Sequence, residues 1–331
     1  MSRRISISLS AFAWPLGVLL LGVTPALARP DYPSRPVKIV VPFLAGGSAD
    51  IITRLVFNKV SEKWNQPVVI ESKPGAGGNI GADAVAKSEP NGYTLLSTAP
   101  GPLAINQYLY DKMPFDPAEA FAPVSLIGVL PNVLVVGPSV KSPTLKEWLD
   151  EAMRRPDKFS YASQGVGTTG HLTGAMLNEA AGLALRHIPY RGFPPALTDV
   201  IRGQVDMMFI DTGNALPRVG KDGLRALGVS TDARVSWLPD VPTFKEIGLP
   251  KIISSTWFAV MAPARTSDDV RQKISGEIAR AVALPELRSS LDKLGVQLVT
   301  SNPKDLQAWI DAERVVWSEI IRGSNIKADQ P

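Results

Sequence analysis

Two stretches of the chain each alternate short apolar runs with longer amphipathic segments. In the first stretch, apolar runs cover Val37–Val41, 68–70 and 94–97, and helical patterns cover Ser48–Trp64 and a segment ending near residue 87. Short apolar runs indicate buried strands, and strands that alternate with helices form a parallel sheet covered by those helices. This stretch therefore predicts one α/β unit, with Ser48 as the N-cap of its first helix.

The same order returns further along the chain. We expect strands at 159–163, 185–189, 205–210 and 224–229, and helices at 168–181 and 196–202. The β-rich runs at 132–136 and 256–261 are expected to cross from one unit to the other and back, and the helical segment 268–331 to pack on the first unit. We predict two domains, residues 29–132 with 257–331 and residues 133–256.

The N-terminal residues have the pattern of a secretory signal. Arg3 and Arg4 precede an apolar run over 11–23, and Ala26-Leu27-Ala28 carries the small residues that a signal peptidase recognises. The run is shorter than the roughly 20 residues of a membrane span. We predict that residues 1–28 are a signal peptide, that the general export route is used, and that the mature protein is periplasmic.

Charge and composition exclude several classes of partner. Removal of residues 1–28 takes away two arginines, so the formal net charge falls from +4 to +2, and no run of lysine and arginine stands out. Neither nucleic acid nor a lipid surface is an expected partner. The chain has no cysteine, so its stability must come from a packed core instead of disulfides.

Three glycine-rich loops each follow a predicted strand and open a predicted helix. They cover 42–50, 73–81 and 163–171. Glycine lets backbone N–H groups approach a ligand, and the start of a helix adds unpaired N–H groups and a partial positive charge. One such loop is equally well a tight turn, but three at the same sheet edges predict a ligand-binding cleft for an anion.

The third loop contains the spacing of a dinucleotide fingerprint at Gly165, Gly167 and Gly170. That fingerprint needs an acidic residue about 20 positions later. The sequence there is Ile188-Pro189-Tyr190-Arg191-Gly192, with no acid, so we expect no dinucleotide and no other cofactor.

Residue patterns typical of catalysis are missing. The chain has no cysteine and no G-x-S-x-G motif, and its two histidines, His171 and His187, have no metal-ligand spacing. We therefore expect neither an enzyme nor a metal site.

Four single residues keep two interpretations each. His171 could bond a ligand or bridge loop and helix, and Asp50 could accept from a ligand or favour the first helical turn. Asp211 follows a strand and could meet a ligand or cap a turn, while Trp257 could contact a ligand or pack in the core. His187 is expected to be structural.

A series of short motifs is shared with one known family: Val41-Pro42-Phe43 with Gly46-Gly47 and Asp50, Lys73-Pro74-Gly75-Ala76-Gly77-Gly78-Asn79, Asn91-Gly92-Tyr93-Thr94-Leu95-Leu96, Tyr161-Ala162-Ser163 with Gly165, Gly167-Thr168 and His171-Leu172, Pro189-Tyr190-Arg191-Gly192, Asp199 with Gly203-Gln204-Val205-Asp206, and Leu238-Pro239-Asp240-Val241-Pro242-Thr243. On these motifs the sequence resembles the Bug family of tripartite tricarboxylate transporter solute receptors, over essentially the whole mature chain.

The resemblance implies a two-domain α/β periplasmic-binding-protein fold, of the Venus flytrap type II-like kind, with two crossover strands. It implies capture of a small carboxylate (a dicarboxylate, an amino acid or an aromatic acid) in the interdomain cleft and delivery to membrane transporter subunits. We expect a monomer. A binding protein that feeds a sensor is the first rival function, and an enzyme on the same fold is the second.

By the same resemblance, the ligand lies against the loop from Phe43, the turn near Thr98 and the loop 163–168, held by backbone and hydroxyl groups and partly through water. The expected ligand contacts are Phe43, Leu44, Gly46, Gly47, Ser48, Asp50, Thr98, Ser163, Gly165, Gly167, Thr168, His171 and Asp211. We expect both the hydroxyl and the N–H of Thr168 to face the cleft. Leu44 stands where the family usually has a small residue or proline, which favours an apolar or aromatic acid over a tricarboxylate. Ala175 stands where the family often has glutamate.

Overall fold

The structure is a computed structural model that describes residues 32–323 and 326. The predicted signal peptide, residues 1–28, and its cleavage after Ala28 lie outside the described residues. Across the described residues, no helix combines the length and the hydropathy of a membrane span.

The first α/β unit, here called the N-terminal group, is present as predicted. Strand β1 (Val37–Val41) pairs in parallel with β2 (Val68–Ser72) on one side and β3 (Thr94–Thr98) on the other. Helix α1 (Ser48–Trp64) follows β1, and α2 (Asn79–Ala86) follows β2 after the short turn η1 (Ala76–Gly78). Val37, Ile39 and Val41 of β1 lie in one hydrophobic cluster and Val40 lies in another. The reason is that successive side chains of a strand point to opposite faces of the sheet.

The second unit, here called the central group, repeats this plan. Strand β5 pairs in parallel with β6 and β7, and β8 joins the sheet antiparallel to β4. Its elements are α3 (Leu145–Arg154), β5 (Ser160–Ser163), α4 (Thr169–Ala181), β6 (Arg186–Pro189), α5 (Phe193–Ile201), β7 (Met207–Asp211), α6 (Thr212–Ala215) and β8 (Arg225–Val229).

Three helices of the central group differ from the prediction. Helices α3 and α6 were not predicted, and α5 begins at Phe193 instead of residue 196. Pro194 and Pro195 lie in the first turn of α5, where the missing N–H has no intrahelical partner to lose and the fixed φ suits a helix. The two prolines therefore belong to the helix, and the predicted start at residue 196 is three residues too late.

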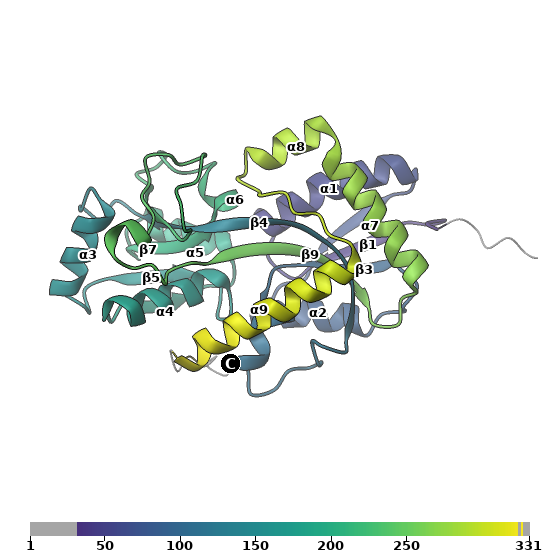
Figure 1. Cartoon of the computed structure of the whole chain (residues 1–331), viewed down its shortest axis with the longest axis horizontal. Coiled ribbons are helices and arrows are strands. Elements are labelled where there is room, and N and C mark those ends of the chain that lie inside the picture. Colours follow the sequence, from purple (N-terminus) through teal and green to yellow (C-terminus); the bar gives the residue numbers. More distant parts are fainter. Residues whose placement is uncertain (1–31, 324–325, 327–331) are drawn as a thin grey trace, which may run out of the picture. The chain divides into compact units, whose positions relative to one another are not determined.

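Two long strands connect the two groups, which confirms the predicted crossovers (Figure 1). Strand β4 (Phe121–Val136) pairs antiparallel with β9 (Ser255–Pro263) up to Pro131, and with β7 from Asn132 onward. The strand order is β2-β1-β3-β9-β4-β7-β5-β6, with β8 also on β4. The crossover is longer than the predicted 132–136, because β4 already begins at Phe121.

The last three helices divide between the two faces of the N-terminal group. Helices α7 (Asp268–Ala283) and α8 (Pro285–Asp292) share a buried cluster with α1, while α9 (Pro303–Gly323) shares one with α2. Leu172 of α4 also belongs to the α9 cluster, so α9 contacts the central group as well. Trp257 is fully buried, and its Nε1 donates to Glu313 Oε2 of α9 at 2.8 Å, which is a packing role.

Candidate ligand-binding site

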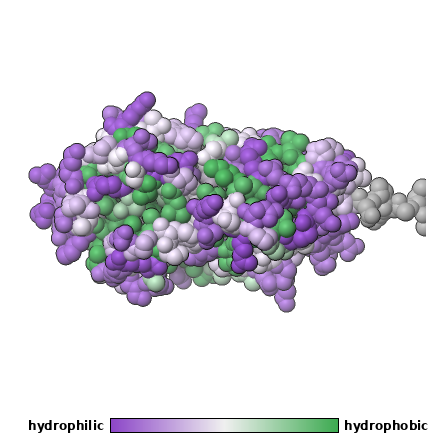
Figure 2. All heavy atoms as spheres, turned by 90° about the horizontal axis from the view of Figure 1, so that it is seen from above, coloured by the Kyte–Doolittle hydropathy of each residue, from purple (hydrophilic) through white to green (hydrophobic). Residues whose placement is uncertain are grey.

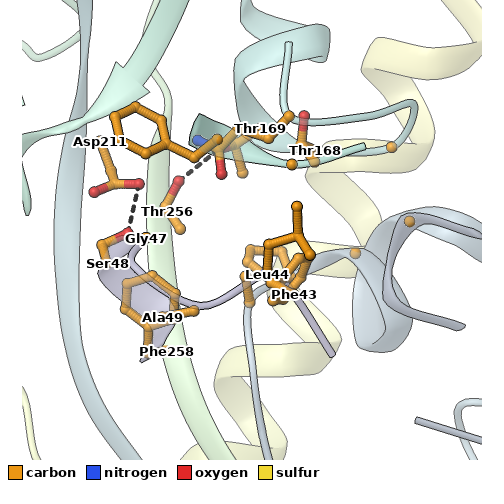
Figure 3. A pocket seen from close by; sticks show the side chains of 18 residues that line it. Phe43, Leu44, Gly47, Ser48, Ala49, Thr168, Thr169, Asp211, Thr256 and Phe258 are labelled. Carbon is orange, nitrogen blue, oxygen red and sulfur yellow. Dashed lines mark hydrogen bonds between the residues drawn. The ribbon is translucent and has the colours of Figure 1, made fainter. Parts of the chain in front are cut away.

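A cleft with an empty volume of about 590 Å³ lies between the N-terminal and central groups (Figure 3). All three predicted glycine loops contribute to it, together with β9 and the start of α5. Its lining residues are Phe43, Leu44, Gly47, Ser48, Ala49, Gly77, Ala99, Pro100, Gly101, Gln164, Gly167, Thr168, Thr169, Gly192, Phe193, Asp211, Thr256 and Phe258.

The start of α1 is held by side chains of the central group. Ser48 N–H donates to Asn214 Oδ1 at 3.2 Å, and the Ser48 hydroxyl donates to Asp211 Oδ2 at 2.9 Å. Gly47, with an extended φ of −88°, is the N-cap and provides no side-chain cap. The prediction that Ser48 caps α1 is therefore wrong: Ser48 is already the first helical residue, and the buried Asp211 carboxylate takes its hydroxyl.

Asp50 stabilises the first glycine loop through hydrogen bonds to its carboxylate. Its buried carboxylate accepts from Gly46 N–H at 3.1 Å and from Arg54 Nε at 2.8 Å. Gly46 has a φ of +85°, a left-handed conformation that favours glycine. Neither residue lines the cleft, so their contacts shape the loop that presents its neighbours.

Thr168 lines the cleft and caps α4. Its hydroxyl accepts from His171 N–H at 3.5 Å and donates to Gly165 O at 2.8 Å, while its own N–H donates to the same carbonyl at 3.3 Å. The prediction that both groups are directed to a ligand is corrected by these bonds, because the loop itself uses them. The next hydroxyl, that of Thr169, bonds to Thr256 of β9 (Figure 3).

Gly167 is the point where loops of the two groups approach most tightly. It has a φ of +82°, and a Cβ at this position would lie 2.3 Å from Oδ1 of Asn106. Asn106 opens the turn η3 (Asn106–Tyr108), which follows β3 in the N-terminal group. A side chain at Gly167 would therefore displace the Asn106 side chain and would strain the backbone at this φ.

Asp211 both lines the cleft and caps a turn. It ends β7, is nearly fully buried, and accepts from Asn214 N–H at 3.1 Å through Oδ1. Its Oδ2 accepts from Asn214 Nδ2 at 3.0 Å and from Ser48. Burial raises the pKa of the Asp211 carboxyl, and the hydrogen bonds from Ser48 and Asn214 act in the opposite direction.

The two histidines lie behind the third glycine loop instead of in the cleft. Their rings stack with centroids 4.0 Å apart, and His171 Nδ1 accepts from Gly167 N–H at 3.4 Å. His187 Nε2 bonds to the Ser163 hydroxyl at 2.7 Å. Burial, and then the neighbouring His187, lower the pKa of His171 to about 3. The contacts of His171 are thus those of a bridge between loop and helix.

The thirteen predicted ligand contacts separate into two sets. Those that line the cleft are Phe43, Leu44, Gly47, Ser48, Gly167, Thr168 and Asp211; those that lie outside the lining are Gly46, Asp50, Thr98, Ser163, Gly165 and His171. Thr98 is fully buried and its hydroxyl donates to Ala99 O, so the residues just after it form the wall.

The lining residues that the sequence analysis did not single out are Ala49, Gly77, Ala99, Pro100, Gly101, Gln164, Thr169, Gly192, Phe193, Thr256 and Phe258. The alternation of side chains along a strand could have identified two of them. Thr256 and Phe258 alternate with the buried Trp257 along β9, so they share one face of the crossover strand. Phe193 gave no signal, because an aromatic residue at the start of a helix is equally typical of a core.

The chemistry available in the cleft is that of binding an anion with an apolar body. The first turns of α1 and α4 present N–H groups that have no intrahelical partner. Phenylalanine and leucine side chains form much of the remaining wall. Searching residues 32–323 and 326 finds no group of three or more histidine, cysteine, aspartate or glutamate residues that could hold a metal ion.

The chain is similar to one protein family and to several bacterial proteins. The profile of the tripartite tricarboxylate transporter family receptor matches residues 52–326. A UPF0065 protein from the tcbD-tcbE intergenic region of Pseudomonas sp. (strain P51) is 37% identical over 90% of this chain and 89% of its own length. Protein BugT of Bordetella pertussis is 33% identical over 92% of this chain and 94% of its own.

Solved structures share the whole fold. Rpa4515 of R. palustris, determined with adipate, has 31% identity and a TM-score of 0.87, covering 90% of this chain and 99% of its own. The periplasmic binding protein BugD has 32% identity and a TM-score of 0.85, covering 89% and 99%. MatC of Rhodopseudomonas palustris, with bound malate, has 29% identity and a TM-score of 0.82, covering 88% and 100%. The predicted two-domain α/β periplasmic-binding-protein fold is thereby confirmed.

Proposed function

Because the chain belongs to the tripartite tricarboxylate transporter receptor family, we propose that it is a periplasmic receptor which captures a small carboxylated molecule in this cleft and delivers it to the membrane subunits of such a transporter. The observation that carries the proposal is the meeting of two helix starts, those of α1 and α4, at one cleft between two α/β groups.

A carboxylate suits these helix starts. Ala49 and Thr169 lie in the first turns of α1 and α4 and line the cleft. The N–H groups of a first turn have no intrahelical partner, and the helix places about half a positive charge there. One ligand carboxylate can thus be bound without lysine or arginine. The relatives determined with adipate and with malate support this ligand class.

Capture requires the two groups to move relative to each other. We place the hinge in β4 and β9, with residues 29–132 and 257–331 moving against residues 133–256. Movement of this kind opens the cleft to solvent and then closes it around the ligand. Transport is favoured over catalysis because the described lining has one ionisable side chain, Asp211, and no histidine to serve as its catalytic partner.

Gly47 offers a direct test of the site. It lines the cleft with an unstrained φ of −88°, and a Cβ there would have its nearest neighbour, Phe193 Cβ, at 3.8 Å. Gly47→Ala should therefore fold normally while its methyl group takes ligand space, and we expect affinity to fall about tenfold, roughly 1.4 kcal/mol. The measurement is calorimetric titration of the purified chain with hexanoate, 3-phenylpropionate, adipate, malate and citrate, and with hexanamide as an uncharged control.

Gly276→Ala is the matched control. Gly276 lies in α7, outside the cleft, and a Cβ there would meet nothing within 4 Å. We expect its affinity to equal that of the unmodified chain. The proposal fails if the unmodified chain binds none of these acids, or if it binds hexanamide as tightly as hexanoate.

A further inference from the structure

Most of the polar side chains that line the cleft already have partners within the protein. Figure 3 marks two bonds between lining residues, from the Ser48 hydroxyl to Asp211 and between the hydroxyls of Thr169 and Thr256. The Thr168 hydroxyl, also in the lining, donates to Gly165 O. These side chains therefore shape the walls and are not free to bind a ligand without giving up a bond.

The carboxamide of Gln164 is different. Gln164 lines the cleft, and no described residue makes a hydrogen bond or an ion pair with its side chain. The residue is half-buried, and neither of its amide atoms is enclosed without a partner, so the amide stays open to solvent in the cleft. A side-chain amide has two N–H donors and one carbonyl acceptor. Gln164 therefore brings unused hydrogen-bonding capacity to the described lining.

The backbone on both sides of Gln164 is fixed by the third glycine loop. Before it, the Ser163 hydroxyl accepts from Gly165 N–H at 3.2 Å and bonds to His187 Nε2 at 2.7 Å. After it, Gly165 O accepts from the hydroxyl and from the N–H of Thr168. The loop therefore presents the Gln164 side chain from a fixed position, which lowers the entropy lost when a ligand binds to it.

Closure of the cleft around a ligand removes water from this amide. An amide that is buried without a partner loses its hydrogen bonds to water and gains none in return. A ligand that places a methyl group against Gln164 leaves the amide in that state, whereas a ligand with a polar group there restores a bond. Sites that are built to hydrogen-bond one ligand group discriminate strongly against analogues that lack it.

We infer that Gln164 is a specificity-determining residue of this cleft, whose side-chain N–H groups donate to a second oxygen-bearing group of the ligand, a hydroxyl, carbonyl or carboxylate, while the first carboxylate lies at the helix starts. The inference rests on the proposed function, since it assigns a further residue of the same site. Because the amide is neutral, the bond requires an acceptor on the ligand and no particular charge.

Two sets of probes isolate the second oxygen-bearing group. Hexanoate is compared with 6-hydroxyhexanoate and adipate, and butyrate with 4-hydroxybutyrate and succinate, so that chain length is constant within each set. Calorimetric titration of the full chain at pH 7.5 should show, in at least one set, an oxygen-bearing acid that binds at least tenfold more tightly than its parent acid.

Gln164→Met keeps the length of the side chain and removes its hydrogen-bonding groups. We expect the affinity ratio of the oxygen-bearing acid to its parent to fall about tenfold, while the parent acid binds as tightly as before or more tightly. The melting temperature should stay near that of the unmodified chain, because the amide has no described protein partner.

Gln164→Glu replaces the N–H donors by a carboxylate of the same size. It should weaken binding of the dicarboxylates adipate and succinate at least tenfold relative to their parent acids, since two negative groups then face each other. Gln272→Glu is the matched control: Gln272 is exposed on α7 and lies outside the lining, so the same change of charge should leave every ratio unaltered.

The results separate this inference from the proposed function. Equal affinity of parent and oxygen-bearing acids in the unmodified chain overturns the inference and leaves a carboxylate receptor, and binding of none of these acids overturns both. An affinity ratio that is unchanged in Gln164→Met, or one that shifts equally in Gln164→Glu and Gln272→Glu, overturns the assignment of Gln164.

Discussion

Among single residues, His171 is a titratable side chain that is buried away from water. It is buried at the start of α4, its ring stacks on His187, and Tyr161 stacks on His187 in turn with centroids 4.9 Å apart. The Tyr161 hydroxyl donates to His171 O at 3.3 Å, so no acid is among these described contacts to stabilise a charged imidazole. His171 therefore stays neutral in the folded protein over the whole physiological range, and its Nδ1 remains an acceptor for Gly167 N–H.

This burial makes stability depend on pH. The pKa of His171 is about 3 in the folded protein, against 6.5 for an ordinary histidine, so the unfolded chain binds a proton that the folded chain does not. The contribution of the neutral, buried His171 to the free energy of unfolding is complete above about pH 6.5 and is lost as the pH falls toward 3. Between pH 6 and 5 the free energy of unfolding should fall by roughly 1 kcal/mol from this group alone.

Urea denaturation at pH 7, 6 and 5 measures this slope. His171→Asn keeps a side-chain acceptor near Gly167 but has no proton to bind, so its slope should be smaller by that amount. Equal slopes in the two proteins would contradict the assignment of a neutral, buried His171.

At the scale of elements, the start of α4 combines a cap, a loop and a wall of the cleft. Thr168 ends the loop by bonding to Gly165 O and begins the helix by accepting from His171 N–H. The same turn places Gly167 against Asn106 of the N-terminal group. The Thr168 hydroxyl is thus one of several groups that order this loop.

Thr168→Val removes the hydroxyl while keeping the shape of the side chain. We expect the free energy of unfolding to fall by about 1 kcal/mol, as for the loss of an N-cap, and ligand affinity to fall as the loop loosens. Thr168→Ser keeps the hydroxyl and should stay near the unmodified protein in both respects. Thermal melting and calorimetric titration of the two variants provide the comparison, and equal behaviour of valine and serine would show that the hydroxyl has no such role.

At the scale of the whole described chain, the N-terminal and central groups share two crossover strands and a polar contact across the cleft. Asn214 bonds to Ser48 through both its Oδ1 and its Nδ2, and Asp211 accepts from the same serine. Thr212 also reaches across, donating to Gly295 O at 2.9 Å. Figure 2 shows apolar and polar side chains interspersed on the face seen from above, where parts of both groups are visible. These contacts hold the two groups together across the cleft.

Asn214→Ala removes two of these bonds and should shift the ligand-free protein toward open forms. Small-angle scattering should show a larger radius of gyration than for the unmodified chain, and saturating ligand should reduce the difference. Asn178→Ala is the matched control, because Asn178 makes two comparable bonds to Leu185 within the central group. Asn178→Ala should lower stability without enlarging the ligand-free protein. The same enlargement in both variants would show that the Asn214–Ser48 hydrogen bonds do not hold the two groups together.

The two α/β groups, the crossovers and the loops that carry the site could be predicted from the amino-acid sequence alone. These follow from local pattern: the periodicity of Ser48–Trp64 and the apolar run Val37–Val41 are readable within one segment, and both elements have the predicted bounds. The glycine loops were equally local, because a loop between a strand and a helix start lies at the carboxyl edge of its sheet.

Which side chains of those loops face the cleft depends on contacts between residues far apart in the chain. The Ser48 hydroxyl donates to Asp211, which lies 163 positions away. Gly167 lies against Asn106 of the other group. Because these partners are distant in sequence, no local pattern could assign the roles of Ser48 and Gly167. Phe193 and Phe258 are typical core residues in sequence, and in the structure they are buried in two different cores while each also lines the cleft. Burial and partner choice are properties of the assembled chain, whereas periodicity and turn chemistry belong to its segments.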